Sequence, residues 1–322
     1  MKVLITGMTG FIGRHLATSL LTEGHEIVGT GLTESEGAFL PPSLRDIPVR
    51  RLDIRDREAV GALLKAVQPE MIYHLAGQAY VIPSFRDPAG TFETNVLGTI
   101  YLFEAMLRFS SQARVAVACS GAEYGWPKSL PVREEHPLEP VSPYGASKAA
   151  QDILAFQYFK SRNLRTLRLR LFGTTGPGKM GDAPNDFASQ IARIEANGGQ
   201  GIVHVGNLST ARDISDVRDT LGAMRAVVDR GQPGEAYNIG RGLPVSIRNV
   251  LNLLLAETRA EIEVKPDPER MRPADEPTLY ADISKLRGLG WEPKVPLKQT
   301  MRELLDFWRN HPDLIPREAG GT

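Results

Sequence analysis

The fold is decided near the start of the chain by Lys2-Val3-Leu4-Ile5-Thr6-Gly7-Met8-Thr9-Gly10-Phe11-Ile12-Gly13. The apolar run over residues 2–6 predicts a buried strand, and the pattern over residues 14–23 predicts a helix. Three glycines join them and let backbone N–H groups at the helix N-terminus approach a phosphate closely. An ordinary tight turn explains only one of these glycines. The stretch therefore predicts a dinucleotide-binding unit that contacts its cofactor through Gly7, Thr9, Gly10, Phe11, Ile12 and Gly13.

Strand-like and helix-like stretches alternate after this unit. The expected strands cover residues 26–31, 50–54, 71–77, 114–119 and 164–171, and the expected long helices cover residues 90–108 and 143–162. Regular alternation of this kind predicts an α/β protein with a Rossmann-type, doubly wound parallel sheet. Such sheets bind their ligands at the carboxyl ends of the strands.

The pattern becomes less regular after Phe172, where shorter elements are rich in Arg, Asp, Gly and Pro. Here we expect a helix that opens at residues 213–217, a strand at 236–240, a helix at 247–256 capped by Ser246, and an amphipathic helix at 296–310. The predicted division is a dinucleotide-binding domain at 1–172, to which residues 212–240 return, and a smaller, discontinuous substrate lobe mainly at 173–312. The last segment, 313–322, has few apolar anchors and is expected to fray.

Composition restricts the classes of partner. The 322 residues include 38 Lys and Arg and 38 Asp and Glu, with no long run of either sign, so no nucleic-acid-binding surface is expected. No stretch reaches the roughly 20 apolar residues of a membrane span. Cys119 is the only cysteine, which excludes an internal disulfide, and no metal-ligand spacing surrounds it. These features favour a small-molecule partner, no bound metal and a reducing, cytoplasmic location.

The stretch Ser142-Pro143-Tyr144-Gly145-Ala146-Ser147-Lys148 opens one of the long helices and carries candidate catalytic residues. Tyr144 and Lys148 are four residues apart, so both lie on one helical face. A nearby ammonium favours the phenolate and is expected to lower the pKa of the tyrosine from about 10 towards neutrality. Tyr144 would then serve as an acid and a base. The pair alone is weak evidence, because Tyr and Lys at this spacing are common on solvated helices.

The end of the second strand does not specify the cofactor clearly. Thr30-Gly31-Leu32-Thr33 offers neither a carboxylate for an adenosine ribose nor an arginine for a 2′-phosphate. Arg14 is either a phosphate partner or a solvated arginine of the first helical turn. Asp53, followed by Ile54, is placed to accept from an adenine amine, to cap the next helix, or both. The weak preference is for NADP over NAD.

Three further positions lie where the cofactor and substrate should meet. The fourth strand ends in Leu75-Ala76-Gly77, whose small residues allow the cofactor to lie against the backbone, and His74 before them is expected to be a packed strand residue. Asn95 falls within a long helix, where a buried amide needs partners, so it is expected to brace the site. Ser120 follows the fifth strand and either donates a hydrogen bond to a substrate oxygen or only caps a turn.

In this order and spacing, Gly7, Gly10, Gly13, Ser120, Tyr144 and Lys148 make the chain resemble the extended short-chain dehydrogenase/reductase family over nearly its whole length. Five stretches resemble signature sequences of the family's nucleotide-sugar branch: residues 75–78, 94–99, 142–148, 212–217 and 237–240. Residues 205–208, 272–275 and 290–296 look most like those of GDP-mannose 4,6-dehydratases and GDP-6-deoxy-D-mannose reductases.

This resemblance implies a catalytic triad of Ser120, Tyr144 and Lys148. Ser120 and Tyr144 would hold the C4 oxygen of the sugar, while Lys148 would bind the nicotinamide ribose and tune Tyr144. Arg212 and Arg272 match family positions that bind the nucleotide diphosphate, because a forked guanidinium suits phosphate oxygens. The alternative for each arginine is a surface ion pair with a neighbouring Asp. The substrate-binding positions that the resemblance implies are Gln78, Ser84, Ser120, Ala122, Glu123, Asn207, Arg212, Arg272 and Asp275, the last of which would accept from the nucleotide ribose.

Two positions depart from the family pattern. Dehydratases carry an acidic residue two positions after the catalytic Ser or Thr, where it removes the C5 proton, and this chain has Ala122 there. Glu123 is one step further on and would face the other way. The change favours ketone reduction over dehydration. Gly173 stands where relatives carry an Asn that contacts the substrate, which leaves the nucleotide and the sugar open.

The leading hypothesis is an NAD(P)H-dependent reductase of a GDP-4-keto-6-deoxyhexose, giving GDP-rhamnose or an epimer. The alternatives are a nucleotide-sugar 4,6-dehydratase or epimerase that retains its NAD(P), and a catalytically silent sensor or scaffold. A silent protein usually loses the Tyr or Lys, and both are intact here. The resemblance also implies a homodimer formed through the helices at 90–108 and 143–162.

Overall fold

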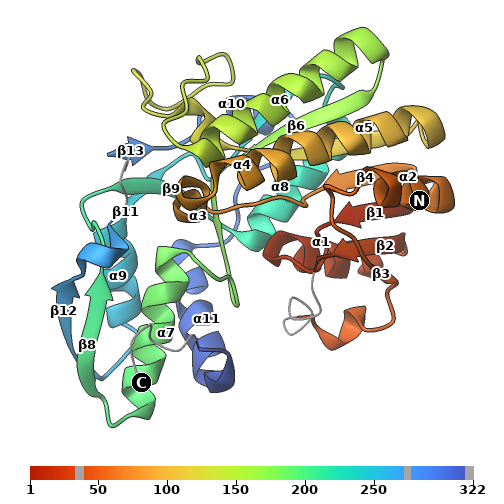
Figure 1. Cartoon of the computed structure of the whole chain (residues 1–322). Coiled ribbons are helices and arrows are strands. Elements are labelled where there is room, and N and C mark those ends of the chain that lie inside the picture. Colours follow the sequence, from red (N-terminus) through yellow and green to blue (C-terminus); the bar gives the residue numbers. More distant parts are fainter. Residues whose placement is uncertain (33–39, 272–276, 316–322) are drawn as a thin grey trace.

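A seven-stranded parallel sheet is the centre of the larger of the two parts of the protein (Figure 1). In the computed structural model, which describes residues 1–32, 40–271 and 277–315, the strand order is β10-β6-β5-β4-β1-β2-β3. The strands are β1 (Lys2–Thr6), β2 (Glu26–Gly31), β3 (Val49–Arg51), β4 (Met71–His74), β5 (Arg114–Ser120), β6 (Arg165–Leu171) and β10 (Ala236–Ile239). The order reverses between β1 and β4, as in doubly wound sheets. The α/β fold expected from the sequence is confirmed.

Helices cover both faces of this sheet, and each face has its own apolar core. The helices are α1 (Phe11–Thr22) and α8 (Val217–Arg230) on one face, and α2 (Arg57–Val67), α5 (Gly98–Phe109) and α6 (Pro143–Arg162) on the other. Side chains alternate along β1, so Val3 and Ile5 pack with α1 and α8, whereas Leu4 packs with α2 and α5. Burial on both faces explains why the central strands β1, β4 and β5 are mostly apolar.

Local signals fix the two ends of α6. The Ser142 side chain accepts from the Gly145 N–H, and Pro143 occupies the first helical turn, where its missing N–H costs nothing. The helix ends at Asn163, which adopts the left-handed conformation with φ of 55°. These caps place the helix start, and therefore Tyr144, at the carboxyl edge of the sheet.

The smaller lobe lies beyond that edge and has a third apolar core (Figure 1). It contains α7 (Ala183–Ala196), α9 (Ile247–Leu255), α11 (Leu297–Asn310) and the parallel pair β8 (Gln200–Val205) and β12 (Glu261–Pro266). A second small sheet consists of β7 (Gly173–Thr175), β9 (Ala211–Asp216), β11 (Pro244–Ser246) and β13 (Thr278–Leu279). Trp308 on α11 is 1% exposed and anchors this core.

The chain returns to the large sheet through α8 and β10, and here one expectation was wrong. Residues 213–216 do not open a helix, because they belong to β9, which pairs with β7 and β11. The buried Asp213 carboxylate accepts backbone N–H bonds from Arg241, Gly242 and Ala281. The helix begins only at Val217, with Asp216 as its cap. The polar Asp-x-x-Asp pattern resembled a helix start although its first aspartate serves the sheet.

Other boundaries shifted by a few residues. The strand expected over 71–77 ends at His74, and the first helix begins at Phe11. Asp53 does not cap the following helix; Asp56 does, while the Asp53 carboxylate binds Arg55. Most of the tail that we expected to fray lies outside the described residues. No helix among the described residues has both the length and the apolar composition needed to cross a bilayer.

Candidate active site

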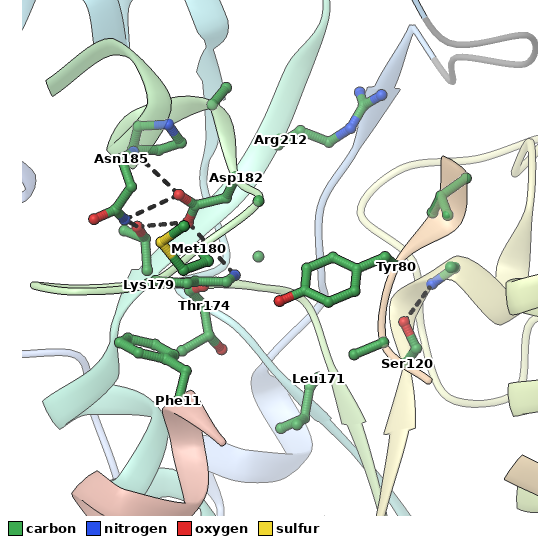
Figure 2. A pocket seen from close by; sticks show the side chains of 18 of the residues that line it. Phe11, Tyr80, Ser120, Leu171, Thr174, Lys179, Met180, Asp182, Asn185 and Arg212 are labelled. Atoms are coloured by element: carbon green, nitrogen blue, oxygen red, sulfur yellow. Dashed lines mark hydrogen bonds and ion pairs between the residues drawn. The ribbon is translucent and has the colours of Figure 1, made fainter. Parts of the chain in front are cut away.

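A cavity of about 950 Å³ lies between the carboxyl edge of the sheet and the smaller lobe. The glycine-rich turn borders it on one side, the start of α6 and the end of β5 on another, and the lobe on the third. Figure 2 shows Phe11, Lys179, Asp182 and Asn185 around one part of the cavity, Ser120 at another, and Tyr80 between them. The carboxyl edge of a doubly wound sheet is where such folds bind nucleotides.

The glycine-rich turn is shaped so that a side chain on it would collide with backbone. Gly7 has φ of +69°, and a Cβ there would lie 2.8 Å from the Ala76 nitrogen. A Cβ on Gly13 would lie 2.4 Å from the Gly7 carbonyl oxygen. Gly10 precedes α1 and supplies no side-chain cap, so the first N–H groups of the helix face the cavity edge. This geometry suits the diphosphate of a dinucleotide.

Tyr144, Lys148 and Ser120 converge on the cavity wall from two elements, α6 and the end of β5. The Ser120 side chain is close enough to the Tyr144 phenol to act on its pKa. The Tyr144 backbone N–H donates to the Ser84 hydroxyl at 3.0 Å, which fixes the first turn of α6 against α3 (Val81–Arg86). Ser84 is completely buried, so it positions Tyr144 from outside the cavity and does not reach a substrate.

The expected lowering of the Tyr144 pKa is wrong for this structure. Burial raises the pKa of Tyr144 to about 12; the Ser120 side chain lowers it in part, and the charge of Glu123 raises it. The Lys148 Nζ instead donates to the Ala118 carbonyl at 2.7 Å and to the Gln151 Oε1 at 2.8 Å. Tyr144 is therefore protonated near neutral pH and ready to donate a proton.

The Lys148 side chain is buried at the cavity wall and held there by hydrogen bonds. It is 6% exposed, and burial lowers its pKa from the usual value. An ammonium has three N–H donors, and the bonds to Ala118 and Gln151 use two of them. The remaining donor is available on the cavity side, next to Gly77.

A buried chain of polar groups continues from Lys148 beneath the glycine-rich turn. The Gln151 Nε2 donates to the Thr99 hydroxyl at 2.7 Å, and this hydroxyl donates to the Asn95 carbonyl at 2.6 Å. His74 lies 3.0 Å from the same hydroxyl, so its Nε2 carries the proton. Its Nδ1 then accepts from the Thr6 hydroxyl at 2.8 Å. His74 is thus a neutral, packed strand residue, as expected.

Asn95 braces the site as predicted and does not line the cavity. It is completely buried in a π-helical turn (Glu93–Leu97) that precedes α5. Its side-chain nitrogen donates to the Gln78 carbonyl and the Ser147 hydroxyl, and its oxygen accepts from the Gln78 N–H. Gln78 is held by these bonds and binds Thr91 through its own amide. These contacts join the segment after β4 to α6.

The structure brings most of the predicted residues into one cavity. Those that line it are Gly7, Gly10, Phe11, Ile12, Gly13, Leu75, Gly77, Ser120, Ala122, Tyr144, Lys148, Asn207 and Arg212. Those that do not are Thr9, Arg14, Asp53, Ile54, Ala76, Gln78, Ser84, Asn95 and Glu123. Arg272 and Asp275 lie outside the described residues.

Three of the residues outside the cavity lining have clear structural roles. Arg14 is not solvated: it is 7% exposed and donates to the Gly178 carbonyl at 2.7 Å. Ile54 packs against α5, where a Cβ on Gly98 would lie 2.7 Å from it. Glu123 is completely buried. A role in ligand binding for Arg14 and Glu123 therefore requires the surrounding packing to open.

Several cavity residues were missed by sequence reasoning. The Asp182 carboxylate caps α7, accepts from the Thr175 hydroxyl at 2.8 Å and from the Asn185 amide at 2.9 Å, and lies 3.5 Å from the Lys179 Nζ. Trp308 donates to the Asn185 Oδ1 at 3.1 Å. Asp182 followed by a proline two positions later is a readable helix start. Nothing in the sequence indicates that this start faces the cavity.

The comparisons with known proteins agree with this geometry. Residues 4–304 match the sequence profile of the GDP-mannose 4,6 dehydratase family. The chain is 32% identical to GDP-6-deoxy-D-mannose reductase of Pseudomonas aeruginosa, covering 96% of this chain and 97% of the relative. It is also 29% identical to UDP-glucose 4-epimerase of Mycolicibacterium smegmatis, covering 96% and 99%.

Solved structures give the same picture. The structure of RMD from Pseudomonas aeruginosa complexed with NADPH has a TM-score of 0.83 at 30% identity, covering 96% of this chain and 99% of the other. UDP-glucose 4-epimerase from Thermotoga maritima with UDP-glucose has a TM-score of 0.87 at 26% identity, covering 97% and 100%.

The buried His74 predicts an acid-sensitive fold. Burial, and less strongly the charge of Lys148, lowers its pKa to about 3, whereas an unfolded histidine titrates near 6.5. Between these values the unfolded chain binds a proton that the folded chain does not. The contribution of His74 to the free energy of unfolding is therefore complete above about pH 6.5. It is lost as the pH falls below that value, by up to about 1.4 kcal/mol per pH unit.

Urea unfolding between pH 7 and pH 4.5 measures this slope. We expect His74→Asn to be less stable at pH 7 but to lose stability less steeply as the pH falls. His311→Asn, at an exposed histidine, is the control and should keep the parental slope. Equal slopes for His74→Asn and the parent would contradict the assignment.

Proposed function

Because the chain belongs to the GDP-mannose 4,6-dehydratase family, we propose that it reduces the C4 ketone of a GDP-4-keto-6-deoxyhexose with NAD(P)H. It is an NAD(P)-dependent enzyme of nucleotide-sugar metabolism. The product would be GDP-rhamnose or its C4 epimer. The reductase of Pseudomonas aeruginosa, whose sequence matches nearly the whole chain, supports this reading within the family.

The observation that carries the proposal is Ala122. It lines the cavity two residues after Ser120, and its methyl group cannot remove a proton from C5 of a sugar. The neighbouring carboxylate does not replace it, because Glu123 is completely buried and its Oε1 accepts from the Ser120 N–H. Reduction of a ketone needs a proton donor and no such base.

Reduction needs a proton donor at the ketone oxygen, and a protonated Tyr144 supports the proposal. The bound nicotinamide would supply a hydride to C4. Tyr144, with its pKa of about 12, holds a proton to give to the C4 oxygen, and the Ser120 hydroxyl is positioned to donate to the same oxygen. Proton transfer prevents charge from accumulating on that oxygen. The Lys148 ammonium would bind the nicotinamide ribose and favour the phenolate that Tyr144 becomes.

Other cavity residues would hold the two nucleotides. The N-terminus of α1 and the glycine-rich turn fit the dinucleotide diphosphate. Arg212 and Asn207 line the lobe side, and Arg212 would bind the diphosphate of the sugar nucleotide. We assign Arg272 and Asp275 to the same nucleotide on the sequence resemblance alone. NADPH is the preferred cofactor, in keeping with the NADPH complex of the Pseudomonas aeruginosa protein.

Epimerisation with a retained NAD(P) is the second candidate. The UDP-glucose 4-epimerase from Thermotoga maritima has the higher TM-score of the two solved structures, 0.87 against 0.83. An epimerase uses the same Ser, Tyr and Lys, so these residues do not separate the two activities. The two activities differ in whether the reaction needs added NAD(P)H.

The first experiment follows the absorbance of reduced nicotinamide when the purified protein is mixed with NADPH or NADH and GDP-4-keto-6-deoxymannose. We expect stoichiometric loss of the band, faster with NADPH. Tyr144→Phe should lower kcat by about 10²- to 10⁴-fold because the proton donor is removed. Tyr158→Phe is the control on the same helix, since its hydroxyl binds Glu104 outside the cavity. Conversion of a nucleotide sugar without loss of the band would reassign the chain to dehydration or epimerisation.

Substitution of Ala122 tests the missing base. With bound NADP⁺ to accept the C4 hydride and return it at C6, Ala122→Glu is expected to give slow elimination of water from GDP-mannose, detected as a 4-keto product, because it places a carboxylate on the cavity wall. Ala122→Gln has nearly the same size without the charge and should give none. Elimination by the parent enzyme at the rate of the Glu variant would refute the argument from Ala122.

We also propose that the protein is a homodimer formed through the outer faces of α5 and α6. These helices pack side by side, and Figure 1 shows them along one side of the molecule. Three large apolar residues on or just before them are exposed: Leu97 at 41%, Ile153 at 57% and Phe156 at 41%. Exposed apolar surface on long helices is typical of a subunit interface.

Light scattering tests the assembly. The parent should have about twice the 35.3 kDa mass of one chain, and the double substitution of Ile153 and Phe156 by Asp should give monomers, because a buried carboxylate in an apolar interface is costly. Leu243→Asp is the control, since Leu243 is equally exposed, at 58%, but lies outside α5 and α6. A monomeric parent would refute the proposal.

A further inference from the structure

Glu123 lies behind Ser120, outside the cavity lining. Its Oε1 accepts the Ser120 backbone N–H at 2.6 Å, and the Ser120 hydroxyl accepts the Ala122 N–H at 3.2 Å. These bonds form a capping box at the start of the 3₁₀ turn Gly121–Tyr124. The turn thereby fixes both the backbone of Ser120 and the direction of its hydroxyl.

This arrangement is costly for the fold. Glu123 is completely buried, and its second oxygen, Oε2, has no hydrogen-bond partner among the described residues. Burial and the charge of Asp152 raise the pKa of Glu123 to about 8, although Arg170 opposes the shift. An apolar side chain of similar size would avoid these costs. What it would lack is an acceptor for the Ser120 N–H.

A buried cluster of acidic and basic side chains, made of Glu123, Asp152, Arg168 and Arg170, connects this turn to the helix that carries Tyr144 and Lys148. The Arg170 Nε lies 3.5 Å from the Glu123 Oε2 and 2.9 Å from the Asp152 Oδ2. Arg168 binds the Asp152 Oδ1 at 2.6 Å. Asp152 follows Lys148 and Tyr144 at successive four-residue steps along α6, so all three share one face.

We propose that Glu123 is a positioning residue for the proposed reduction: by accepting the Ser120 N–H, it aims the Ser120 hydroxyl at the oxygen that Tyr144 protonates. Arg170 holds Glu123 and Asp152 together, so the turn and α6 keep one relative position. The inference rests on the proposed function, because the oxygen concerned is that of the substrate ketone. Glu123 itself does not touch the substrate.

Metal binding does not account for the same cluster. The ligand atoms of Cys119, Glu123 and Asp152 lie within 4.8 Å of one another. However, the guanidinium groups of Arg168 and Arg170 already bind the Asp152 carboxylate, and Arg170 approaches Glu123. A cation among these three ligands would face two positive charges at close range.

Kinetics of Glu123→Leu and Glu123→Gln test the proposal. The Leu variant should lose about 10- to 100-fold in kcat, because a misplaced donor is costly in the transition state, while the KM for NADPH changes less than about twofold. The Gln variant keeps an acceptor oxygen and should retain kcat within about threefold. Equal losses for Leu and Gln, or no loss for Leu, would overturn the role assigned to Oε1.

Glu134 offers matched controls. Its Oε1 also accepts a backbone N–H, that of Asn238 at 2.8 Å, and it does not line the cavity. Glu134→Leu should lower the unfolding midpoint, and both Glu134 variants should leave kcat unchanged. Loss of kcat in the Glu134 variants equal to that in Glu123→Leu would show a general effect on folding and would refute a specific role for Glu123.

A double-mutant cycle separates action through Ser120 from other effects. In a Ser120→Ala background, Glu123→Leu should cost nothing further in kcat, whereas additive losses would refute the proposal. If Glu123→Leu does not fold, Glu123→Asp replaces it, because Asp keeps a carboxyl group near Arg170 but is too short to reach the Ser120 N–H in the same geometry.

Amide hydrogen exchange gives a readout that does not depend on turnover. The Ser120 amide should be protected in the parent and in Glu123→Gln, and should exchange faster in Glu123→Leu. Unchanged protection in the Leu variant would overturn the proposal even in an active enzyme. A parent that consumes no reduced nicotinamide but shows the expected exchange pattern would refute the proposed reaction and leave the Glu123–Ser120 contact established.

Discussion

The buried guanidinium of Arg170 is the contact on which the geometry of the site depends. It extends from β6 and binds Asp152 on α6, approaches Glu123 below Ser120, and donates to the Tyr124 hydroxyl and the Glu134 carbonyl at 2.8 Å each. One side chain thus connects the sheet, α6 and the turn after β5. Because removing one partner of a buried ion pair leaves an uncompensated charge, at a cost of about 3–5 kcal/mol, these segments cannot shift independently.

The second constraint is the close approach of backbone segments at the glycine-rich turn. Gly7 lies against the segment that follows β4, and Gly13 lies over the turn itself, so a Cβ at either position would collide with main-chain atoms. Below this turn, the polar chain from Thr6 through His74, Thr99 and Gln151 reaches Lys148. The part of the cavity suited to a diphosphate and the part with the triad therefore rest on one set of buried hydrogen bonds. Every member of such a network needs its partners, which makes the network specific in geometry.

Burial also decides the chemistry of the triad. In a solvated helix, Lys148 would act on Tyr144 mainly through its charge, and the phenol would ionise more easily. In the folded protein, the ammonium is directed to the Ala118 carbonyl and Gln151, and desolvation keeps Tyr144 protonated. A protonated phenol beside a serine, without a carboxylate at position 122, would suit the proposed donation of a proton to the oxygen of a ketone that is being reduced. The same groups in a less buried setting would favour proton abstraction.

The sequence by itself determined the doubly wound sheet, the glycine-rich turn and the candidate triad, because each depends on local signals: strand and helix periodicity, helix caps, and residue spacing along one face. Ser142, Pro143 and Tyr144 are readable in this way. Only the tertiary structure decided which residues line the cavity and how they are charged. The sequence placed three residues next to bound ligands, but in the structure they bind other parts of the chain: Ser84, Asp53 and Arg14. Asp213 belongs to a strand, although a helix start was expected there. The hydrogen-bond partners of Ser84, Arg14 and Asp213 are 28 to 164 residues away along the chain. No local sequence pattern encodes such distant partners, or the desolvation that shifts the pKa values.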